Sequence, residues 1–347
     1  MKVLNLPIEP LEERYSTQWD KWFQDGFKKE EVEYLTIHGD VTKGKIEFGS
    51  FLDVMETNRY KTWQTTAIIT TLQRYKDDYT LILFFHDLWH PGLTQIAYIR
   101  DGMGWKNLKI CGCLHAGSYD KHDFLNKTGM TTWARGLENA WFGSIVDEIY
   151  VATNFHKSLL CARRTVDSYK VKVTGFPLVP DFLPNKVELE DIIVFPHRLN
   201  EEKQPEQFDN LQDAMNEEAA IYGWKWYKTK EAVQTKMEYY KLLGKAKVAV
   251  SFALQETWGI AMQEAVLCGC IPICPNRLSY TECCVLFRVA RLRTVINGYT
   301  IDSILFNKET GLELMEVNCV GEKTNITDII LSLMNLTIIE HKDLSHD

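Results

Sequence analysis

Two glutamates stand eight residues apart around the predicted start of a helix, in the stretch V-A-V-S-F-A-L-Q-E-T-W-G-I-A-M-Q-E that begins at Val248. An apolar β-type run ends at Ala253, a short loop carries Glu256 and ends near Gly259, and Glu264 follows in the helical segment. Backbone N–H groups at a helix N-terminus bind anions. A diphosphate lying there would leave one glutamate for a ribose diol and the other for a sugar, which suits a nucleotide-diphosphate sugar. The alternative is a buried helix whose two glutamates face solvent.

A second pair of charged residues follows the preceding predicted strand, where the chain reads F-P-H-R-L-N-E-E-K from Phe195. The guanidinium of Arg198 can bind a phosphate through two N–H groups, and Lys203 adds a point charge. Together they can stabilise the negative charge that grows on a leaving diphosphate. The alternative is a solvated loop with incidental charges.

The elements that must position these residues alternate between strand-like and helix-like runs along the first half of the chain. This β-α-β-α order is typical of a parallel sheet with helices on both faces. The predicted strands are Lys2–Leu6, Val32–Ile37, Tyr79–Phe85, Leu108–Leu114, Glu148–Ala152 and Val171–Thr174. The predicted helices are Tyr15–Phe27, Thr62–Tyr75, Gln95–Arg100, Thr132–Phe142 and Asn154–Arg164.

A proline-rich segment, G-F-P-L-V-P-D-F-L-P from Gly175, interrupts the series and reads as a linker between domains. A second series of strands follows at Asp191–Phe195, Lys247–Ala253 and Ile271–Cys274, and Ile326–Ile339 is predicted as a last helix. We therefore expect one domain over residues 1–178, a second over 185–322, and a C-terminal helix within 323–347 that can pack back on the first domain. Two such domains would face a cleft.

Polar residues follow the predicted strands at the places where open α/β sheets bind ligands, beyond the carboxyl ends of the strands. Asp87, His115, His197 with Arg198, and Glu256 all come shortly after an apolar strand. This placement favours a functional role for them over incidental surface positions.

Composition excludes several classes of protein. The chain has 347 residues, 45% of them hydrophobic and 25% charged, which is ordinary for a globular protein. A net charge of −8 argues against a uniformly cationic nucleic-acid binder but allows a local basic groove. No apolar run is long enough to span a membrane, and Pro7 and Pro10 interrupt the first strand too early for a secretory signal. Nine cysteines, an odd number, indicate reduced thiols and a cytoplasmic location.

Two groups of residues could suggest metal binding, but neither has the features expected of a metal site. His86 and His90 have a spacing that suits a helix, with Asp87 between them and His115 nearby in topology, but their segment contains Pro91-Gly92 and reads as a loop. The cysteines near the second strand of the other domain lack paired C-x2-C spacing, so we expect buried thiols. Those cysteines are Cys268, Cys270, Cys274, Cys283 and Cys284.

The residues around both charged pairs carry a family resemblance. They read F-P-H-R-L-x-x-x-K-x-P-E-x-F from Phe195, and E-x-W-G-I-A-M-x-E-A-V-x-C-G-C-x-P-x-C-P-N-R-L-x-Y-x-E from Glu256. This pattern resembles the second domain of retaining GT-B glycosyltransferases, enzymes with two Rossmann-like parallel-sheet domains. The Glu-x7-Glu and Arg-x4-Lys pairs are similar to the broad family-4-like group. The finer details resemble the tRNA-queuosine mannosyltransferase-like branch, whose members glycosylate a modified nucleoside. The resemblance is specific over residues 192–282 and looser over the first half.

The resemblance implies a role for each residue. Arg198 and Lys203 would bind the diphosphate of a UDP- or GDP-sugar together with N–H groups near Gly259 and Ile260. Glu264 would hold the ribose and Glu256 would contact the donor sugar. In the first, acceptor-binding domain, His115 would lie near the sugar and Asp87 near the acceptor hydroxyl. Enzymes of this group are thought to use the leaving phosphate to deprotonate the acceptor, so the resemblance implies no metal.

The chain departs from the group on the acceptor side. The loop after Lys2–Leu6 lacks the double glycine that is common there, and His115 is followed by Ala-Gly-Ser in place of Glu-Asn. The region Cys283–Asn318 also differs from the usual continuation. The donor site therefore carries over better than the acceptor site.

Basic clusters and aromatic residues bear on a nucleic-acid acceptor. Trp89, Trp105 and Trp133 look exposed and could stack on a displaced base, although each could equally be core. The basic clusters, which could equally be solvated helix faces, are Lys28-Lys29, Lys106 with Lys109, Arg163-Arg164 with Lys170 and Lys172, and Arg288 with Arg291 and Arg293.

We expect transfer to a hydroxyl on a modified base in nucleic acid. Hydroxymethylpyrimidine DNA such as hydroxymethylcytosine of bacteriophages is favoured over tRNA, because the acceptor half departs from the tRNA-acting branch and shows no added tRNA-binding appendage. The alternatives are a tRNA queuosine-type transferase and a glycan or lipid glycosyltransferase. A lipid acceptor predicts a membrane-facing stretch, for which Tyr15–Lys29 is a poor candidate. A sugar-nucleotide-binding protein without activity is disfavoured by the intact donor residues.

Overall fold

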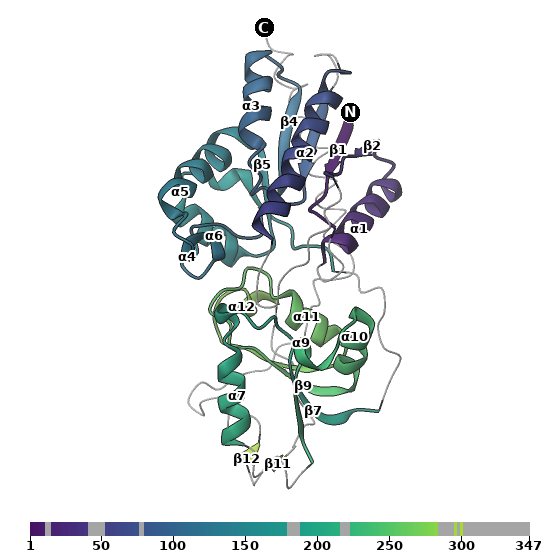
Figure 1. Cartoon of the computed structure of the whole chain (residues 1–347), viewed down its shortest axis with the longest axis vertical. Coiled ribbons are helices and arrows are strands. Elements are labelled where there is room, and N and C mark those ends of the chain that lie inside the picture. Colours follow the sequence, from purple (N-terminus) through teal and green to yellow (C-terminus); the bar gives the residue numbers. More distant parts are fainter. Residues whose placement is uncertain are drawn as a thin grey trace. The chain divides into compact units, whose positions relative to one another are not determined.

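The computed structural model divides the chain into two compact units, the first over Met1–Val179 and the second over Pro180–Val320. In Figure 1 the first unit carries helices α1–α6 and the second carries α7 and α9–α12. The structure describes residues 1–10, 15–40, 53–75, 80–178, 188–215, 223–283, 295–296 and 299–300. The predicted C-terminal helix within 323–347 lies outside the described residues.

The first unit is built on a six-stranded sheet in the order β2-β1-β3-β4-β5-β6. Every neighbouring pair is parallel, as the alternation of elements predicted. The central strand β3 is buried at every residue, as a strand covered on both faces must be. The strands are β1 Lys2–Leu6, β2 Tyr34–Thr36, β3 Leu81–Phe85, β4 Leu108–Cys113, β5 Glu148–Val151 and β6 Val171–Val173.

Helices cover both faces of this sheet because successive residues of β3 point to opposite sides. Leu83 shares a core cluster with Ile68 and Ile96, whereas Phe84 meets Phe23 edge to face, with ring centroids 4.9 Å apart. The helices are α1 Ser16–Lys29, α2 Val54–Leu72, α3 Leu93–Gly102, α4 Phe124–Lys127, α5 Thr131–Ala140 and α6 Asn154–Arg163. A π-helical turn, Trp141–Ile145, continues α5, and a 3₁₀ turn, Ser168–Lys170, precedes β6.

Helix α2 begins earlier than the apolar periodicity predicted. The carboxylate of Asp53 accepts hydrogen bonds from the backbone N–H groups of Met55 and Glu56 at 3.0 Å, which caps the helix there. The added turns bring Tyr60 and Lys61 into the helix, and both take part in the candidate site described below.

The second unit holds a four-stranded parallel sheet in the order β10-β9-β7-β8. Strand β8 and helix α10 were absent from the sequence prediction. The strands are β7 Glu190–Phe195, β8 Lys225–Lys228, β9 Ala246–Val250 and β10 Ile271–Ile273. The helices are α7 Pro205–Ala214, α9 Thr229–Ala232, α10 Lys236–Lys245, α11 Ile260–Leu267 and α12 Tyr280–Cys283. Strands β11 Val295–Ile296 and β12 Tyr299–Thr300 form a separate antiparallel pair.

Glycines set both ends of α11. Gly259 precedes the helix with φ of 75°, and a Cβ there would lie 3.1 Å from a ring carbon of Tyr280. Gly269 follows the helix with φ of 98°. A side chain at Gly259 would therefore be strained and crowded, so this residue fixes the path of the chain between Glu256 and the helix.

Seven cysteines lie within the described residues, and all are free thiols. Burial raises the pKa of the Cys268 thiol to about 12 and raises that of Cys270 further. Within the described part of the chain, the helices are all too short or too polar to span a membrane.

Candidate functional site

The second unit brings Lys203 and Glu256 together at the carboxyl ends of β7 and β9. Lys203 ends a 3₁₀ turn, Glu201–Lys203, and only 5% of its surface is exposed. Its ammonium donates hydrogen bonds to the carbonyl oxygen of Gln255 at 2.6 Å and to Oε2 of Glu256 at 3.0 Å. The sequence placed both residues in one site without predicting that they touch.

Glu256 is ionised at neutral pH although it is buried. Burial alone would raise its pKa, but the Lys203 ammonium and the backbone N–H of Gly259 lower it to about 2. The Gly259 N–H therefore binds this carboxylate, whereas the prediction assigned it to a diphosphate. Ile260 begins α11 directly after it.

Arg198 lies on the same loop and is more open to solvent than Lys203. Its side chain is 35% exposed. The Nε and Nη2 atoms lie 3.2 and 2.8 Å from Oε1 of Glu202. The edge of the guanidinium that suits a phosphate is thus already bound by a carboxylate.

His197 is buried, and no specific role for it was predicted from the sequence. Its Nε2 atom is buried, and no hydrogen-bond partner for it exists within the described structure. Burial and the nearby Lys203 ammonium lower the pKa of His197 to about 3, so the ring is neutral. Buried ring nitrogens normally have partners, so this atom is suited to a ligand hydroxyl or phosphate oxygen.

Glu264 is only 3% exposed and is held by three side chains of α10. Lys236 donates to Oε1 at 2.5 Å, Tyr240 donates to Oε1 at 2.7 Å, and Tyr239 donates to Oε2 at 3.0 Å. The Glu256 side chain is only 14% exposed. The alternative that both glutamates face solvent is therefore wrong. The sequence missed the α10 residues because no motif marks them.

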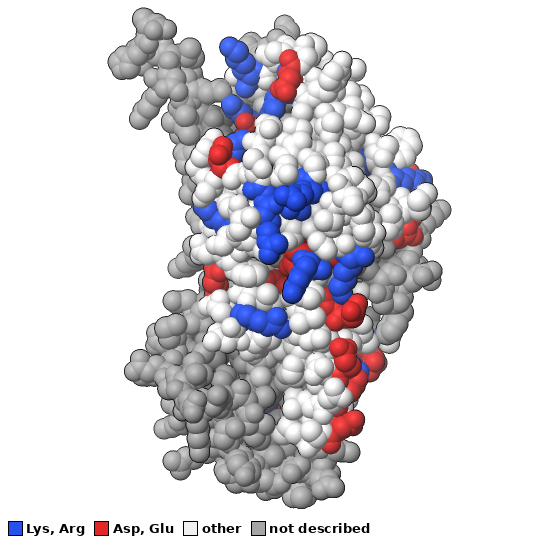
Figure 2. Space-filling model, turned by 90° about the vertical axis from the view of Figure 1, so that its left-hand side faces the viewer, with Lys and Arg blue, Asp and Glu red and all other residues white. Residues whose placement is uncertain are grey.

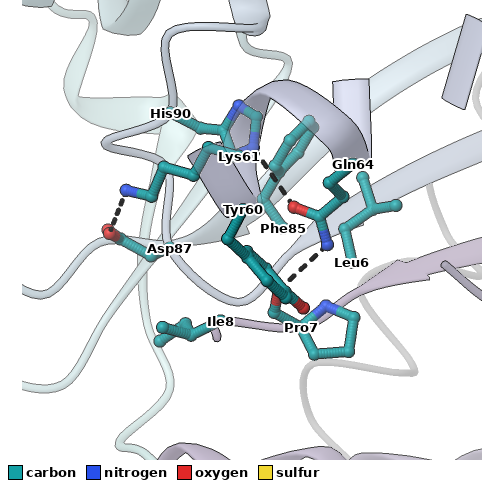
Figure 3. A pocket seen from close by; sticks show the side chains of 9 residues that line it. All are labelled: Leu6, Pro7, Ile8, Tyr60, Lys61, Gln64, Phe85, Asp87 and His90. Atoms are coloured by element: carbon teal, nitrogen blue, oxygen red, sulfur yellow. Dashed lines mark hydrogen bonds and ion pairs between the residues drawn. The ribbon is translucent and has the colours of Figure 1, made fainter. Parts of the chain in front are cut away.

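In the first unit, Asp87 follows β3 and lies beside Lys61 of α2 (Figure 3). Its Oδ1 accepts a hydrogen bond from the backbone N–H of Trp89 at 3.1 Å. Lys61 lies 3.4 Å from Oδ2 and donates to the carbonyl oxygen of Trp89 at 2.6 Å. Burial opposes ionisation of Asp87, but the Lys61 ammonium outweighs it and lowers the pKa of the carboxyl group.

A small hollow adjoins this pair (Figure 3). Its volume of about 10 Å³ is room for roughly one water molecule. Gln64 fixes the wall, because its amide donates to the carbonyl oxygens of Pro7 and Ile37 and its Oε1 faces Nε2 of His90 at 3.2 Å. The lining residues are Leu6, Pro7, Ile8, Tyr60, Lys61, Gln64, Phe85, Asp87 and His90.

Both ring nitrogens of His115 are engaged within the first unit. Nε2 lies 2.8 Å from the carbonyl oxygen of His86 and therefore donates, while Nδ1 lies 3.2 Å from the hydroxyl of Tyr15. Burial lowers the pKa of His115, so the ring is neutral. The rings of Trp19 and Phe176 lie 4.9 and 5.0 Å from it. Among the described residues, no cluster of three or more His, Cys, Asp or Glu side chains is arranged to hold a metal ion.

A buried ion pair links Glu138 of α5 to Arg164 at the end of α6, and no sequence motif indicated it. Glu138 is fully buried, and its Oε2 lies 2.6 Å from Nη2 of Arg164. Its Oε1 accepts from the indole of Trp89 at 2.9 Å and from the backbone of Ser118 at 2.7 Å. Arg164 therefore does not belong to the basic surface cluster that was predicted for it.

The aromatic residues considered for base stacking differ in exposure. Trp105 is 5% exposed and belongs to the core, so the prediction that it could stack on a base is wrong. Trp133 on α5 is 50% exposed and contacts the partly buried Trp89. Figure 2 shows Lys and Arg side chains gathered on the side of the first unit that carries α5. Exposed basic residues of this region include Lys127 and Arg135.

Comparisons with known proteins support the fold. No family model matches the chain. It is 36% identical over 78 residues to a tRNA-queuosine alpha-mannosyltransferase of Drosophila melanogaster, a match that spans 22% of this chain and 18% of that protein.

Among solved structures, the chain is similar to sucrose-phosphate synthase from Thermosynechococcus elongatus, with a TM-score of 0.53 and 9% identity over 81% of this chain and 82% of that one. It also matches HepE of Anabaena in complex with UDP and glucose, with a TM-score of 0.47 and 11% identity over 81% and 82% of the two chains. The predicted fold of two parallel-sheet α/β domains of the GT-B type is confirmed.

Proposed function

We propose that the chain is a glycosyltransferase that uses a nucleotide-diphosphate sugar, bound by the second unit. The observation that carries this proposal is the buried Lys203 ammonium, held between Gln255 and Glu256 beyond the carboxyl ends of β7 and β9. The fold shared with sucrose-phosphate synthase and the 78-residue similarity to a queuosine mannosyltransferase support it.

The charged residues suit a diphosphate leaving group. Lys203 donates to two acceptors within the described structure, and an ammonium has three N–H groups. We assign the third N–H, with the guanidinium of Arg198, to the diphosphate of a UDP- or GDP-sugar. The buried Lys203 ammonium stabilises the growing phosphate charge more strongly than water would, and Arg198 adds a second positive charge from a more exposed position.

The transfer itself exchanges one bond at the anomeric carbon. The bond to the diphosphate oxygen breaks, the bond to the acceptor oxygen forms, and the acceptor proton passes to the leaving phosphate. We propose retention of configuration, with the ionised Glu256 contacting the donor sugar and Glu264 the ribose. The chain supplies position and charge, and this step needs no protein nucleophile.

For the acceptor, we propose a hydroxyl group on a modified base in nucleic acid, recognised by the first unit beside Asp87. The exposed Trp133 and the basic side chains around α5 suit a polyanion with stacking bases. Sequence features favour hydroxymethylpyrimidine DNA, whereas the similarity to a tRNA-queuosine transferase favours tRNA. His115 then serves to shape this part of the unit through its bonds to His86 and Tyr15.

The decisive experiment is nucleoside mass spectrometry after incubation with UDP-glucose, UDP-N-acetylglucosamine or GDP-mannose and one of three acceptors. The acceptors are hydroxymethylcytosine DNA, unmodified DNA and queuosine-containing tRNA. A mass gain of one hexose or one N-acetylhexosamine on one modified nucleoside, absent with Lys203→Met, is the expected result. Transfer only to glycan or lipid acceptors would overturn the acceptor proposal. Nucleotide binding without transfer to any acceptor would indicate a binding protein.

A further inference from the structure

Both cations of the donor site are paired with carboxylates in the chain alone. Arg198 binds Oε1 of Glu202 through Nε and Nη2, and Lys203 binds Oε2 of Glu256. With two cations and two carboxylates, this cluster carries no net charge, and the buried His197 adds none. A diphosphate therefore meets a neutral cluster, and at least one of the pairs has to change before the cations can bind it fully.

The two pairs differ in how firmly they are fixed. Lys203 is buried and also holds the carbonyl of Gln255, so its pair with Glu256 is part of the local structure. Arg198 is 35% exposed, which leaves its long side chain room to turn. The pair that can exchange its partner is thus Arg198 with Glu202.

Glu202 is anchored where a phosphate would compete with it. Its carbonyl oxygen accepts the backbone N–H of Leu254 at 2.8 Å, which ties the loop after β7 to the loop after β9. Its side chain is 13% exposed. The carboxylate therefore stays in place beside Arg198 and presents one oxygen to the same guanidinium edge that binds phosphates.

We propose that Glu202 occupies the place of a donor phosphate on Arg198, and that Arg198 exchanges Glu202 for the phosphate when a nucleoside diphosphate binds. This inference rests on the proposed function, and it makes Glu202 a determinant of donor affinity. A singly charged anion cannot displace the Glu202 carboxylate from Arg198, whereas a diphosphate that also binds Lys203 can. The site then discriminates against monophosphates and weak anions.

A purely structural role for Glu202 predicts the opposite sign. If its carboxylate only orients Arg198 for the donor, removing the negative charge weakens donor binding or leaves it unchanged. If it competes with the donor, removing the charge strengthens binding. The direction of the change in Kd therefore decides between the two roles.

The test is isothermal titration calorimetry of the full chain with UDP, GDP, inorganic pyrophosphate, uridine and guanosine. Glu202→Gln keeps the shape and a hydrogen-bond acceptor but removes the charge, and Glu206→Gln, at an exposed position in the first turn of α7, is the matched control. We expect Glu202→Gln to lower the Kd of pyrophosphate and of the tighter-binding nucleoside diphosphate about 3- to 10-fold at low salt. The Kd values of the nucleosides should stay unchanged, and Glu206→Gln should match the wild type.

A double-mutant cycle ties the effect to Arg198. In an Arg198→Met background, Glu202→Gln should no longer change the Kd of pyrophosphate, because the guanidinium for which the carboxylate and the phosphate compete is absent. Thermal melts confirm folding, and Glu202→Ala serves if Glu202→Gln does not fold. Binding that is unchanged or weaker in the Glu202 variants overturns the inference alone. Absence of binding to any diphosphate in every variant, wild type included, overturns the proposed function.

Discussion

The ammonium of Lys203 lies 3.0 Å from a carboxylate oxygen of Glu256, and both side chains are almost fully buried. The two residues stand 53 positions apart in the chain, so their contact joins the loops after β7 and β9. Removing one partner of such a pair leaves an uncompensated buried charge. The same contact therefore supports the fold and holds the ammonium for the donor.

These two roles can be separated by mutation. Lys203→Met should lower the free energy of unfolding by about 3 kcal/mol, because Glu256 is left buried and unpaired, and should abolish transfer. The double variant Lys203→Met/Glu256→Gln should recover most of the stability and none of the transfer. Urea denaturation and a donor-turnover assay check the pair of outcomes. A double variant that transfers sugar would contradict the assignment of Lys203.

Acid should weaken the second unit through Glu256. The pKa of this carboxyl group is about 2 in the folded chain, below the ordinary value of 4.5. Its ionised form is favoured by folding, so its contribution is complete above pH 4.5 and is lost as the pH falls through about 2. Denaturation series across this window should show a steeper loss of stability in the wild type than in Glu256→Gln. Equal slopes would mean that folding does not depress this pKa.

Local patterns predicted the six strands of the first unit and β7, β9 and β10 of the second, although not β8, and they predicted the strand ends at which the site residues lie. Strand β1 was predicted with the bounds that it has, and Asp87 and Glu256 follow strands as expected. Alternation and burial are properties of short stretches, so a single sequence carries them. The same strand ends indicated that Lys203 and Glu256 belong to one site.

The partners that fix the site were missed because they come from distant segments. Lys61 lies 26 residues from Asp87, and Glu138 lies 26 residues from Arg164. Arg164 stood beside Arg163 in the sequence and looked like half of a surface cluster, yet its buried partner is on another helix. Trp105 likewise looked exposed and is core, since a lone tryptophan does not reveal what covers it.

Glu264 provides a test of ribose recognition. Its carboxylate accepts hydrogen bonds from Lys236, Tyr239 and Tyr240, and a carboxylate has about four acceptor positions. If a ribose hydroxyl uses the remaining one, Glu264→Gln should bind the nucleoside diphosphate about 10-fold more weakly. The analogue without ribose hydroxyls should bind wild type and variant equally.

The control for this test is Glu238→Gln, which changes an exposed carboxylate in the first turn of α10 to an amide that can still cap the helix. It should leave the binding of both nucleotides unchanged. A Glu264→Gln variant that weakens both nucleotides by the same factor would show that Glu264 acts on the structure of the unit and not on ribose.

Asp87 and Lys61 present complementary groups to an acceptor hydroxyl. The Lys61 ammonium has two acceptors among the described residues and so retains one N–H, while the ionised Asp87 retains acceptor positions beside it. A neutral hydroxyl can donate to Asp87 and accept from Lys61, whereas an anion or a cation would be repelled by one of them. Lys61→Met and Asp87→Asn should therefore raise the KM for the acceptor about 10-fold or more.

Neither substitution should change the Kd for the nucleoside diphosphate, which the second unit binds. The exposed Lys106→Met is the control, and a matching rise in its acceptor KM would mean that the effect is a general loss of positive charge from the first unit.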